Sequence, residues 1–313
     1  MIKISIVTSL YRSAEFVNEF YERHLACIKQ LGLNYEFIFV DDGYPDNAIL
    51  NVKALIKNDE KVKLIVFSRN FGQYPAMFAG MKHASGDIIY TTDSDLEEAP
   101  ENILKLYDSM KQNTELDIIY GLVNTRKGGF IKAIMGNLFY RIMVWVSDVK
   151  IPKNISWQIL MKKDYVTALM QYDEAETLPS GLMMLTGFNQ SSIQIEKSYK
   201  GNSTYSFSKR LKLAMNSITA FSSKPMVFIG LIGLGITFIA FIGMISAIII
   251  KLFFLNYQPG WISIILSIWL IGGLILSSVG ITGIYIAKIF NQVKRRPLYI
   301  IKSIIQADVP EQL

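Results

Sequence analysis

Short apolar runs alternate with amphipathic stretches through the first third of the chain. The runs are rich in β-branched and aromatic residues, which favour strands, and the stretches between them carry apolar residues at helical spacing. Alternation of this kind through short connections is typical of an α/β domain with a mostly parallel sheet. We predict strands at 3–10, 35–40, 62–67 and 88–90, with helices at 14–30, 48–57 and 71–82.

Two long uncharged apolar runs lie near the C-terminus, at 226–250 and 261–287. Each is long enough to cross a bilayer as a helix, and the short loop between them predicts a two-helix transmembrane hairpin. Basic residues flank the hairpin on its outer sides, whereas the connecting loop has only Lys251. By the positive-inside rule, we expect both termini and the N-terminal region in the cytoplasm, since residues 2–10 form too short an apolar run for a cleavable signal.

Composition supports a membrane protein rather than an ordinary soluble enzyme. The 313 residues are 51% hydrophobic, and the mean hydropathy is +0.29. The net charge of +6 comes with basic residues clustered beside the apolar runs, which predicts anionic lipid or pyrophosphate partners and no nucleic acid. A basic amphipathic helix is expected at 207–221, where it would lie on the membrane surface. The single cysteine, Cys27, excludes an intramolecular disulfide.

Acidic residues follow two of the predicted strands. Asp93, Asp95, Glu97 and Glu98 come after the strand at 88–90, and Asp42 comes after the strand at 35–40. The carboxyl ends of parallel strands meet at one edge of a sheet, so both groups are expected to face one cleft. Carboxylates separated by one residue suit Mg²⁺, which takes a few carboxylate oxygens and completes its shell with phosphate and water. An isolated Asp-x-Asp also occurs in solvated turns, so the neighbouring motifs determine whether this one is read as a metal site.

Those neighbours resemble family 2 glycosyltransferases with a GT-A fold, and most of all the polyprenyl-phosphate branch, which includes dolichol-phosphate mannose synthases and bactoprenol glucosyltransferases. The motifs occur in the family's order and spacing and cover nearly the whole chain. They are Val-Asp-Asp-Gly at 40–43, Ser-Arg-Asn-Phe-Gly at 68–72, Ala-Ser-Gly-Asp at 84–87, Asp-Ser-Asp-Leu-Glu-Glu-Ala-Pro-Glu at 93–101, Phe-Tyr-Arg at 139–141, Ile-Pro at 151–152, Thr-Tyr-Ser-Phe-Ser-Lys at 204–209 and Ile-Thr-Ala-Phe-Ser at 218–222.

The resemblance implies a GT-A catalytic domain over 1–205 and a juxtamembrane amphipathic helix over 206–224. Two transmembrane helices over 225–290 and a cytoplasmic tail over 291–313 follow. It also implies roles for the acidic residues, with Mg²⁺ or Mn²⁺ held by Asp95 and Glu97 and with Asp93 and Asp95 acting in catalysis. The nucleotide is expected to contact Thr8, Leu10, Asp42, Arg69, Asp93 and Ser94.

Basic residues in glycine-containing loops are candidates for binding phosphate. Flexible glycines beside cations suit a loop that closes over a phosphate group. The resemblance implies catalytic roles for Arg126 and Arg141 near the acceptor phosphate, and Lys127, Lys197 and Lys200 are further candidates for acceptor or donor phosphate. Ordinary solvated side chains remain the alternative for these loops.

The chain departs from the family pattern at two positions near the expected acceptor site. Trp157 stands where relatives carry an aspartate that has been considered a catalytic base, and Ser180 stands where they carry an arginine. An anionic lipid phosphate needs no base, whereas a sugar hydroxyl does. The departure at Trp157 therefore favours a phosphate acceptor.

The resemblance implies inverting, metal-dependent transfer of a sugar from a nucleotide sugar, expected to be a UDP-sugar, to undecaprenyl or another polyprenyl phosphate. The enzyme would sit in the inner membrane with its catalytic domain in the cytoplasm, and relatives with this hairpin can form homo-oligomers. The alternative reaction is transfer to a hydroxyl of a lipid-linked or surface glycan. A non-catalytic sugar-nucleotide-binding protein is a further alternative, against which the intact aspartates argue.

Overall fold

The computed structural model describes residues 2–123, 152, 154–172, 179–197, 224–253 and 261–307. The chain divides into two compact units, and each is considered by itself. Residues 1–136, 149–204 and 296–313 form the first unit, and residues 137–148 and 205–295 form the second. The juxtamembrane helix expected at 206–224 falls almost wholly outside the described residues, so it stays a prediction.

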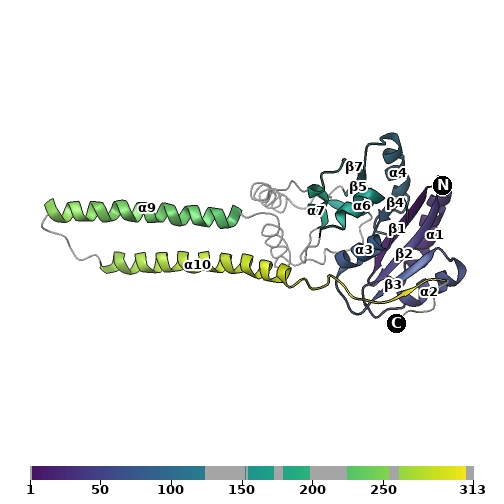
Figure 1. The fold of residues 1–313 in the computed structure, drawn as a ribbon, viewed down its shortest axis with the longest axis horizontal. Helices are drawn as coiled ribbons and strands as arrows, with labels where there is room; N and C mark the ends of the chain where they lie inside the picture. The colour runs from purple at the N-terminus through teal and green to yellow at the C-terminus, as the bar shows by residue number, and fades with distance from the viewer. Residues whose placement is uncertain are drawn as a thin grey trace. The chain divides into compact units, whose positions relative to one another are not determined.

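The first unit is built on an eight-stranded sheet with the order β7-β5-β6-β4-β1-β2-β3-β8 (Figure 1). The pairs β1–β2, β1–β4, β2–β3 and β5–β7 are parallel, and the pairs β3–β8, β4–β6 and β5–β6 are antiparallel. The mostly parallel α/β sheet is therefore confirmed. The strands are β1 (Lys3–Leu10), β2 (Asn34–Asp41), β3 (Val62–Phe67), β4 (Ile88–Thr91), β5 (Ile118–Val123), β6 (Ile155–Lys162), β7 (Gln190–Ile195) and β8 (Ile301–Ile305).

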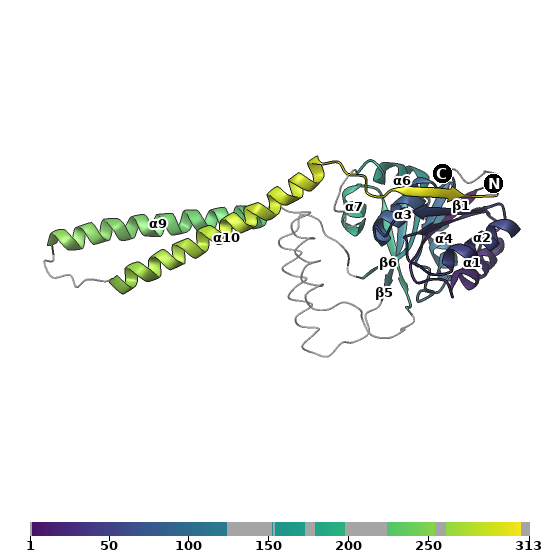
Figure 2. The ribbon, with the colours of Figure 1, turned by 90° about the horizontal axis from the view of Figure 1, so that it is seen from below.

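Helices cover both faces of this sheet because its central strands are apolar on both sides. Helices α1, α2 and α4 pack on the face that presents Phe37 and Phe39, and Figure 2 shows these three helices grouped together. Helix α3 packs on the opposite face, where Gly80 lies against Val7 and Val40. The helices of this unit are α1 (Val17–Leu31), α2 (Ala48–Asn58), α3 (Gln73–Lys82), α4 (Asn102–Gln112), α6 (Lys163–Leu169) and α7 (Pro179–Leu185).

Strand β8 is an element that the sequence analysis did not anticipate. It lies within the segment expected to be a tail, yet it pairs antiparallel with β3 and completes one edge of the sheet. Just before it, the ring of Tyr299 stacks on that of Phe67, with centroids 5.1 Å apart and planes 10° from parallel. The chain thus returns to its first unit after the long C-terminal helices.

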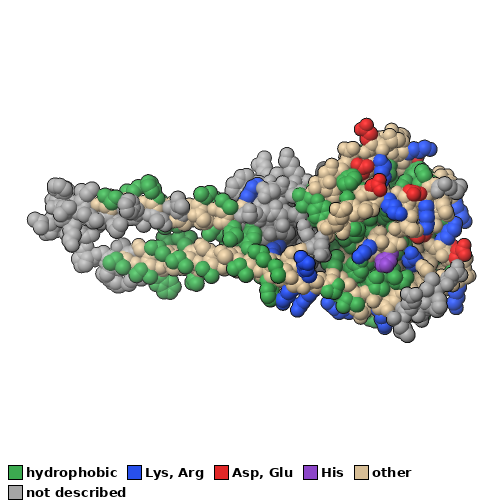
Figure 3. Space-filling model, in the orientation of Figure 1, with side chains coloured by type: hydrophobic (Ala, Val, Ile, Leu, Met, Phe, Trp, Pro, Cys, Tyr) green, Lys and Arg blue, Asp and Glu red, His purple; other side chains and the backbone are tan. Residues whose placement is uncertain are grey.

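The second unit contains two long helices, α9 (Lys224–Phe253) and α10 (Trp261–Val293). They lie side by side and run antiparallel (Figures 1 and 2). Hydrophobic side chains follow both helices in the space-filling view (Figure 3). Among the described residues, one segment is long and apolar enough to cross a membrane, Ser267–Val293 in α10, with a mean hydropathy of 1.9. The predicted apolar runs thus coincide with two helices, one of which is a candidate membrane span.

Candidate active site

The loop after β4 carries the acidic residues of the candidate site. Ser94 fastens this loop to the neighbouring strand, because its hydroxyl donates to the backbone oxygen of Ser9 at 2.9 Å and lies 2.7 Å from the hydroxyl of Ser13. Ser94 is buried. Its side chain therefore positions the loop at the carboxyl edge of the sheet, which is where α/β proteins bind ligands.

Carboxylates crowd together in this loop. Burial and the nearby charges of Glu98 and Asp95 raise the pKa of Asp93 to about 8, and burial also raises the pKa of Glu98. The ammonium group of Lys197 partly balances these charges, since it lies 3.0 Å from Glu97 Oε2 and 3.8 Å from Glu98 Oε1. The structure thus brings together Glu97, which was predicted as a metal ligand, and Lys197, which was predicted to bind phosphate.

The chemistry of this donor set fits a hard divalent cation. In the part of the chain that the structure describes, no group of three His, Cys, Asp or Glu side chains is arranged to hold a metal ion. Mg²⁺ does not need one, because it is commonly held by one or two carboxylates together with the phosphates of the substrate. Asp93 and Asp95 could supply those carboxylates. A cation would offset the burial and the neighbouring negative charges that raise the pKa of Asp93.

The two aspartates at the end of β2 are both buried but differ in their hydrogen bonds. Asp42 accepts hydrogen bonds from the backbone amides of Phe71 at 2.7 Å and Gly72 at 3.0 Å, so it holds the loop that precedes α3. Among the described residues, Asp41 accepts one weak hydrogen bond, from the amide of Gly43 at 3.3 Å. Burial raises the pKa of Asp41 to about 6. Of the two, Asp41 has the greater free capacity to accept a ligand N–H group.

Sequence analysis missed an aromatic group beside these aspartates. The rings of Tyr11 and Tyr44 lie with centroids 4.8 Å apart, and the guanidinium of Arg12 lies 5.1 Å from the centre of the Tyr44 ring. Tyr11 is 50% exposed, and Arg12 has a left-handed φ of 57° that is uncommon outside glycine. Half-exposed aromatic rings at a strand end are suited to stack on a nucleobase. The signal in the sequence was the pair of bulky residues directly after β1.

The other nucleotide candidates have varied surroundings. Thr8 and Leu10 are buried in β1, and the hydroxyl of Thr8 has no hydrogen-bond partner among the described residues. Arg69 is exposed, donates to the backbone oxygen of Asn70 at 3.0 Å and lies over the ring of Phe71. Leu10 belongs to the hydrophobic core, so only its backbone could contact a nucleotide.

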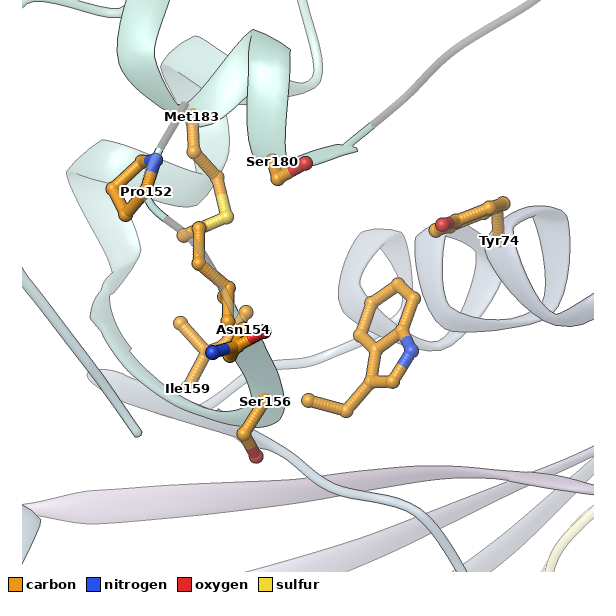
Figure 4. Close-up of a pocket in the computed structure, with 9 residues that line it drawn as sticks. Tyr74, Pro152, Asn154, Ser156, Ile159, Ser180 and Met183 are labelled. Atoms are coloured by element: carbon orange, nitrogen blue, oxygen red, sulfur yellow. The ribbon is translucent and has the colours of Figure 1, made fainter. Parts of the chain in front are cut away.

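The two positions that depart from the family pattern, Trp157 and Ser180, line one pocket (Figure 4). The ring of Tyr74 lies 5.2 Å from that of Trp157. The preceding residue, Gln73, donates from its side-chain amide to Asp93 Oδ1 at 2.5 Å. Gln73 and Tyr74 were also missed, because the start of a helix gives no sign that it faces a loop more distant in the sequence.

Four candidates lie outside the described residues, and their roles stay predictions. They are Arg126, Lys127, Arg141 and Lys200.

Comparison with known proteins gives three results. A family model described as glycosyl transferase family 2 matches residues 5–166. The chain is 37% identical over 308 residues to a Mycobacterium tuberculosis protein named putative glycosyltransferases, covering 98% of this chain and 90% of that protein. It is 30% identical over 304 residues to the bactoprenol glucosyl transferase of Shigella phage SfII, covering 96% of this chain and 98% of that protein.

Among solved structures, a mannosyltransferase from Pyrobaculum calidifontis in complex with GDP-Man and Mn²⁺ is similar with a TM-score of 0.48 and 12% identity, over 69% of this chain and 63% of that one. The match at 5–166 spans both the sheet edge and the acidic loop described above. This chain is a glycosyltransferase with a GT-A-like α/β fold, and it belongs to glycosyl transferase family 2.

Proposed function

We propose that the enzyme transfers one sugar from a nucleotide sugar, expected to be a UDP-sugar, to a polyprenyl phosphate at the cytoplasmic face of a membrane. The observation that carries this proposal is the cluster of Asp93, Asp95, Glu97 and Glu98 at the carboxyl edge of the sheet. Its excess negative charge suits a divalent cation that also binds a diphosphate. Similarity over nearly the full length to proteins named bactoprenol glucosyl transferase supports the lipid acceptor.

The buried carboxylate of Asp41 supports a nucleoside with an N–H group at its base edge, as uracil and guanine have. A buried acceptor with one weak bond gains from a donor that a ligand supplies. The exposed ring of Tyr11 would then stack on the base, with Tyr44 behind it. In this arrangement the base lies beside the ends of β1 and β2, and the diphosphate extends toward the loop after β4.

A phosphate oxygen of the lipid attacks the anomeric carbon of the sugar in this proposal. The attack comes from the face opposite the diphosphate, so the configuration at that carbon inverts. The bond between the carbon and the diphosphate oxygen breaks, and its electron pair leaves with the nucleoside diphosphate. Asp93 and Asp95 would hold Mg²⁺ or Mn²⁺, which would neutralise the charge on the leaving group. The hydrogen bonds of Ser94 hold the loop after β4, so these carboxylates are in place before the donor arrives.

The acceptor phosphate is already anionic at neutral pH, and it therefore needs no general base. This agrees with Trp157 at the position where relatives carry an aspartate. A hydroxyl acceptor is the second candidate, and it would require a carboxylate near the anomeric carbon to take the proton. Trp157 cannot take that proton, so its presence favours a phosphate acceptor over a hydroxyl acceptor.

The position of β8 supports a hairpin that crosses the membrane twice. The sheet of the first unit holds both the N-terminal strand β1 and the C-terminal strand β8. Both strands must therefore lie on the same side of the membrane, so the chain between them crosses it an even number of times. Since α10 contains one candidate span, α9 would supply the second crossing.

A transfer assay tests this proposal. Purified protein is incubated with undecaprenyl phosphate, a panel of radiolabelled UDP- and GDP-sugars, and either Mn²⁺ or EDTA. We expect an organic-extractable, acid-labile product that forms with Mn²⁺ and is absent with EDTA. Donor hydrolysis without a lipid product would instead favour the hydroxyl acceptor. The absence of both hydrolysis and transfer with every donor would contradict the proposal.

A further inference from the structure

A pocket of about 230 Å³ is lined by residues of β6, α3 and α7 and by residues just before β6 (Figure 4). Strand β6 forms one wall, and helices α3 and α7 contribute Tyr74 and Met183. Ile155, Trp157 and Ile159, which alternate along the strand, line this pocket, and Ser156 lines it as well. The pocket wall is thus part of the sheet itself, which makes it a fixed feature of the fold.

At Gln158 and Leu160, the other face of β6 packs away from the pocket. Gln158 accepts a hydrogen bond from the side-chain amide of Asn102 at 2.9 Å, and Leu160 belongs to the hydrophobic core. These contacts set the register of β6. Because a slip of one residue would turn every side chain to the opposite face, they also hold Trp157 toward the pocket.

Three contacts join the pocket to the acidic loop. The hydroxyl of Thr91, two residues before Asp93, donates to the backbone oxygen of Trp157 at 2.9 Å. Ser156, which lines the pocket, donates to Glu98. On the opposite wall, Tyr74 follows Gln73, whose amide contacts Asp93. A group bonded to a diphosphate at the acidic loop would therefore be delivered directly to the pocket.

The lining of the pocket is uncharged among the described residues. It combines apolar and aromatic side chains with the small polar groups of Asn154, Ser156 and Ser180. Its volume is below the roughly 300–1,000 Å³ of pockets that take drug-sized ligands. The space therefore suits a single ring that has an apolar face and several hydroxyl groups, which describes a sugar better than a phosphate or an isoprenoid chain.

We propose that this pocket receives the sugar ring of the donor, with Trp157 as a specificity-determining residue that stacks on the ring and selects neutral sugars. The inference rests on the proposed function, because a nucleotide sugar must bind at the acidic loop. A sugar acid would bring a carboxylate against a wall whose described residues carry no counter-charge, and burying an unpaired charge is unfavourable. Neutral hexoses avoid this cost, while Ser180 and Asn154 offer hydrogen bonds to their hydroxyl groups.

Calorimetric binding to the full-length protein in detergent, with Mn²⁺ present, tests the role of Trp157. The probes are UDP, UDP-glucose, UDP-N-acetylglucosamine, UDP-galactose and UDP-glucuronate, with GDP and GDP-mannose in parallel. For the neutral nucleotide sugar that binds most tightly, Trp157→Ala should weaken affinity roughly tenfold. Affinity for the free nucleotide should stay within about twofold, because the nucleotide does not reach the pocket. Trp157→Phe should recover most of the loss.

Trp269→Ala is a matched control, since it removes an exposed tryptophan from α10, in the other unit. It should leave every affinity unchanged. Equal weakening of UDP and UDP-sugar in Trp157→Ala would overturn the inference, as would no weakening of either. Both outcomes leave the proposed function standing. A wild-type protein that binds none of the nucleotides or nucleotide sugars would contradict the proposed function itself, and the inference with it.

Selection by charge is tested with UDP-glucose and UDP-glucuronate, which differ at one carbon of the sugar. We expect wild-type protein to bind UDP-glucuronate at least about tenfold more weakly than UDP-glucose, and Ser180→Arg to reduce that difference by adding a counter-charge to the wall. Equal affinity of the wild-type protein for the two donors would overturn the assignment of the pocket to neutral sugars.

Discussion

Two adjacent aspartates at the end of β2 show how differently neighbouring carboxylates can act. Asp42 satisfies two backbone amides and is needed to hold the loop before α3. Asp41 is buried with one weak hydrogen bond, and ionising it in the folded protein is unfavourable. A residue kept in such a position at a cost in stability is commonly a binding residue. The resemblance pointed to Asp42, whereas the geometry makes Asp41 the better candidate to contact the base.

Asp41→Asn should stabilise the protein at high pH and weaken nucleotide binding. The pKa of Asp41 is raised from 3.8 to about 6, so the folded state holds its proton more tightly than the unfolded state does. The ionised group thus costs on the order of 3 kcal/mol above pH 6, and this cost fades as the pH falls from 6 toward 3.8. Thermal unfolding in detergent at pH 8 should show a higher Tm for the variant, with a smaller difference at pH 4.5.

The contrasting substitution is Asp42→Ala. It leaves the amides of Phe71 and Gly72 without their acceptor, so we expect a loss of about 1–3 kcal/mol at both pH values. If Asp41→Asn lowered the Tm at pH 8 as Asp42→Ala does, Asp41 would be a structural residue rather than a strained binding residue.

At the scale of elements, the contact of α3 with the sheet depends on a glycine. A Cβ atom at Gly80 would lie 2.3 Å from Val7 Cγ1 and 3.2 Å from Val40 Cγ2. Gly80→Ala should therefore destabilise the first unit by about 1–3 kcal/mol through overpacking. Adding Val7→Ala to this variant should recover part of the loss, which a double-mutant cycle of unfolding free energies would measure. A fully stable Gly80→Ala variant would show that α3 is not packed as described.

The local pattern of apolar and polar residues was enough to predict the central strands of the sheet. Strands β1 and β3 have the predicted bounds, β4 is one residue longer at its C-terminal end, and β2 is one residue longer at each end. Strand β8 was missed because it has only five residues and its partner, β3, lies more than two hundred positions earlier. No feature of the local sequence indicates that these two strands pair. For the same reason the sequence identified Trp157 as unusual but not Tyr74 as its neighbour.

The acidic residues were predicted as a group because they follow one another in a single loop. Their counter-charge was less predictable, since Lys197 follows β7, about a hundred positions later, and its salt bridge with Glu97 depends on the tertiary fold. Pairing of this kind reflects the order of strands in the sheet, which spacing along the chain does not reveal.

For the whole molecule, the pairing of β3 with β8 is the basis of the proposal that both ends of the chain lie on one side of the membrane. Reporter fusions at residues 1 and 313 should therefore both indicate the cytoplasm, and a fusion in the loop at 254–260 should indicate the opposite side. Membrane fractionation of the same fusions would confirm insertion. Opposite locations for the two termini would contradict an even number of crossings.

The central claim is that the carboxylates after β4 support metal-dependent transfer of a sugar to a lipid phosphate. The most direct test compares wild-type protein, Asp95→Ala and the control Asp108→Ala, which changes an exposed residue of α4, in the transfer assay with undecaprenyl phosphate and Mn²⁺. We predict lipid-linked product from wild type and from Asp108→Ala, and a loss of at least about a hundredfold in Asp95→Ala with its membrane insertion and Tm retained. Turnover in Asp95→Ala equal to that of wild type would contradict the account.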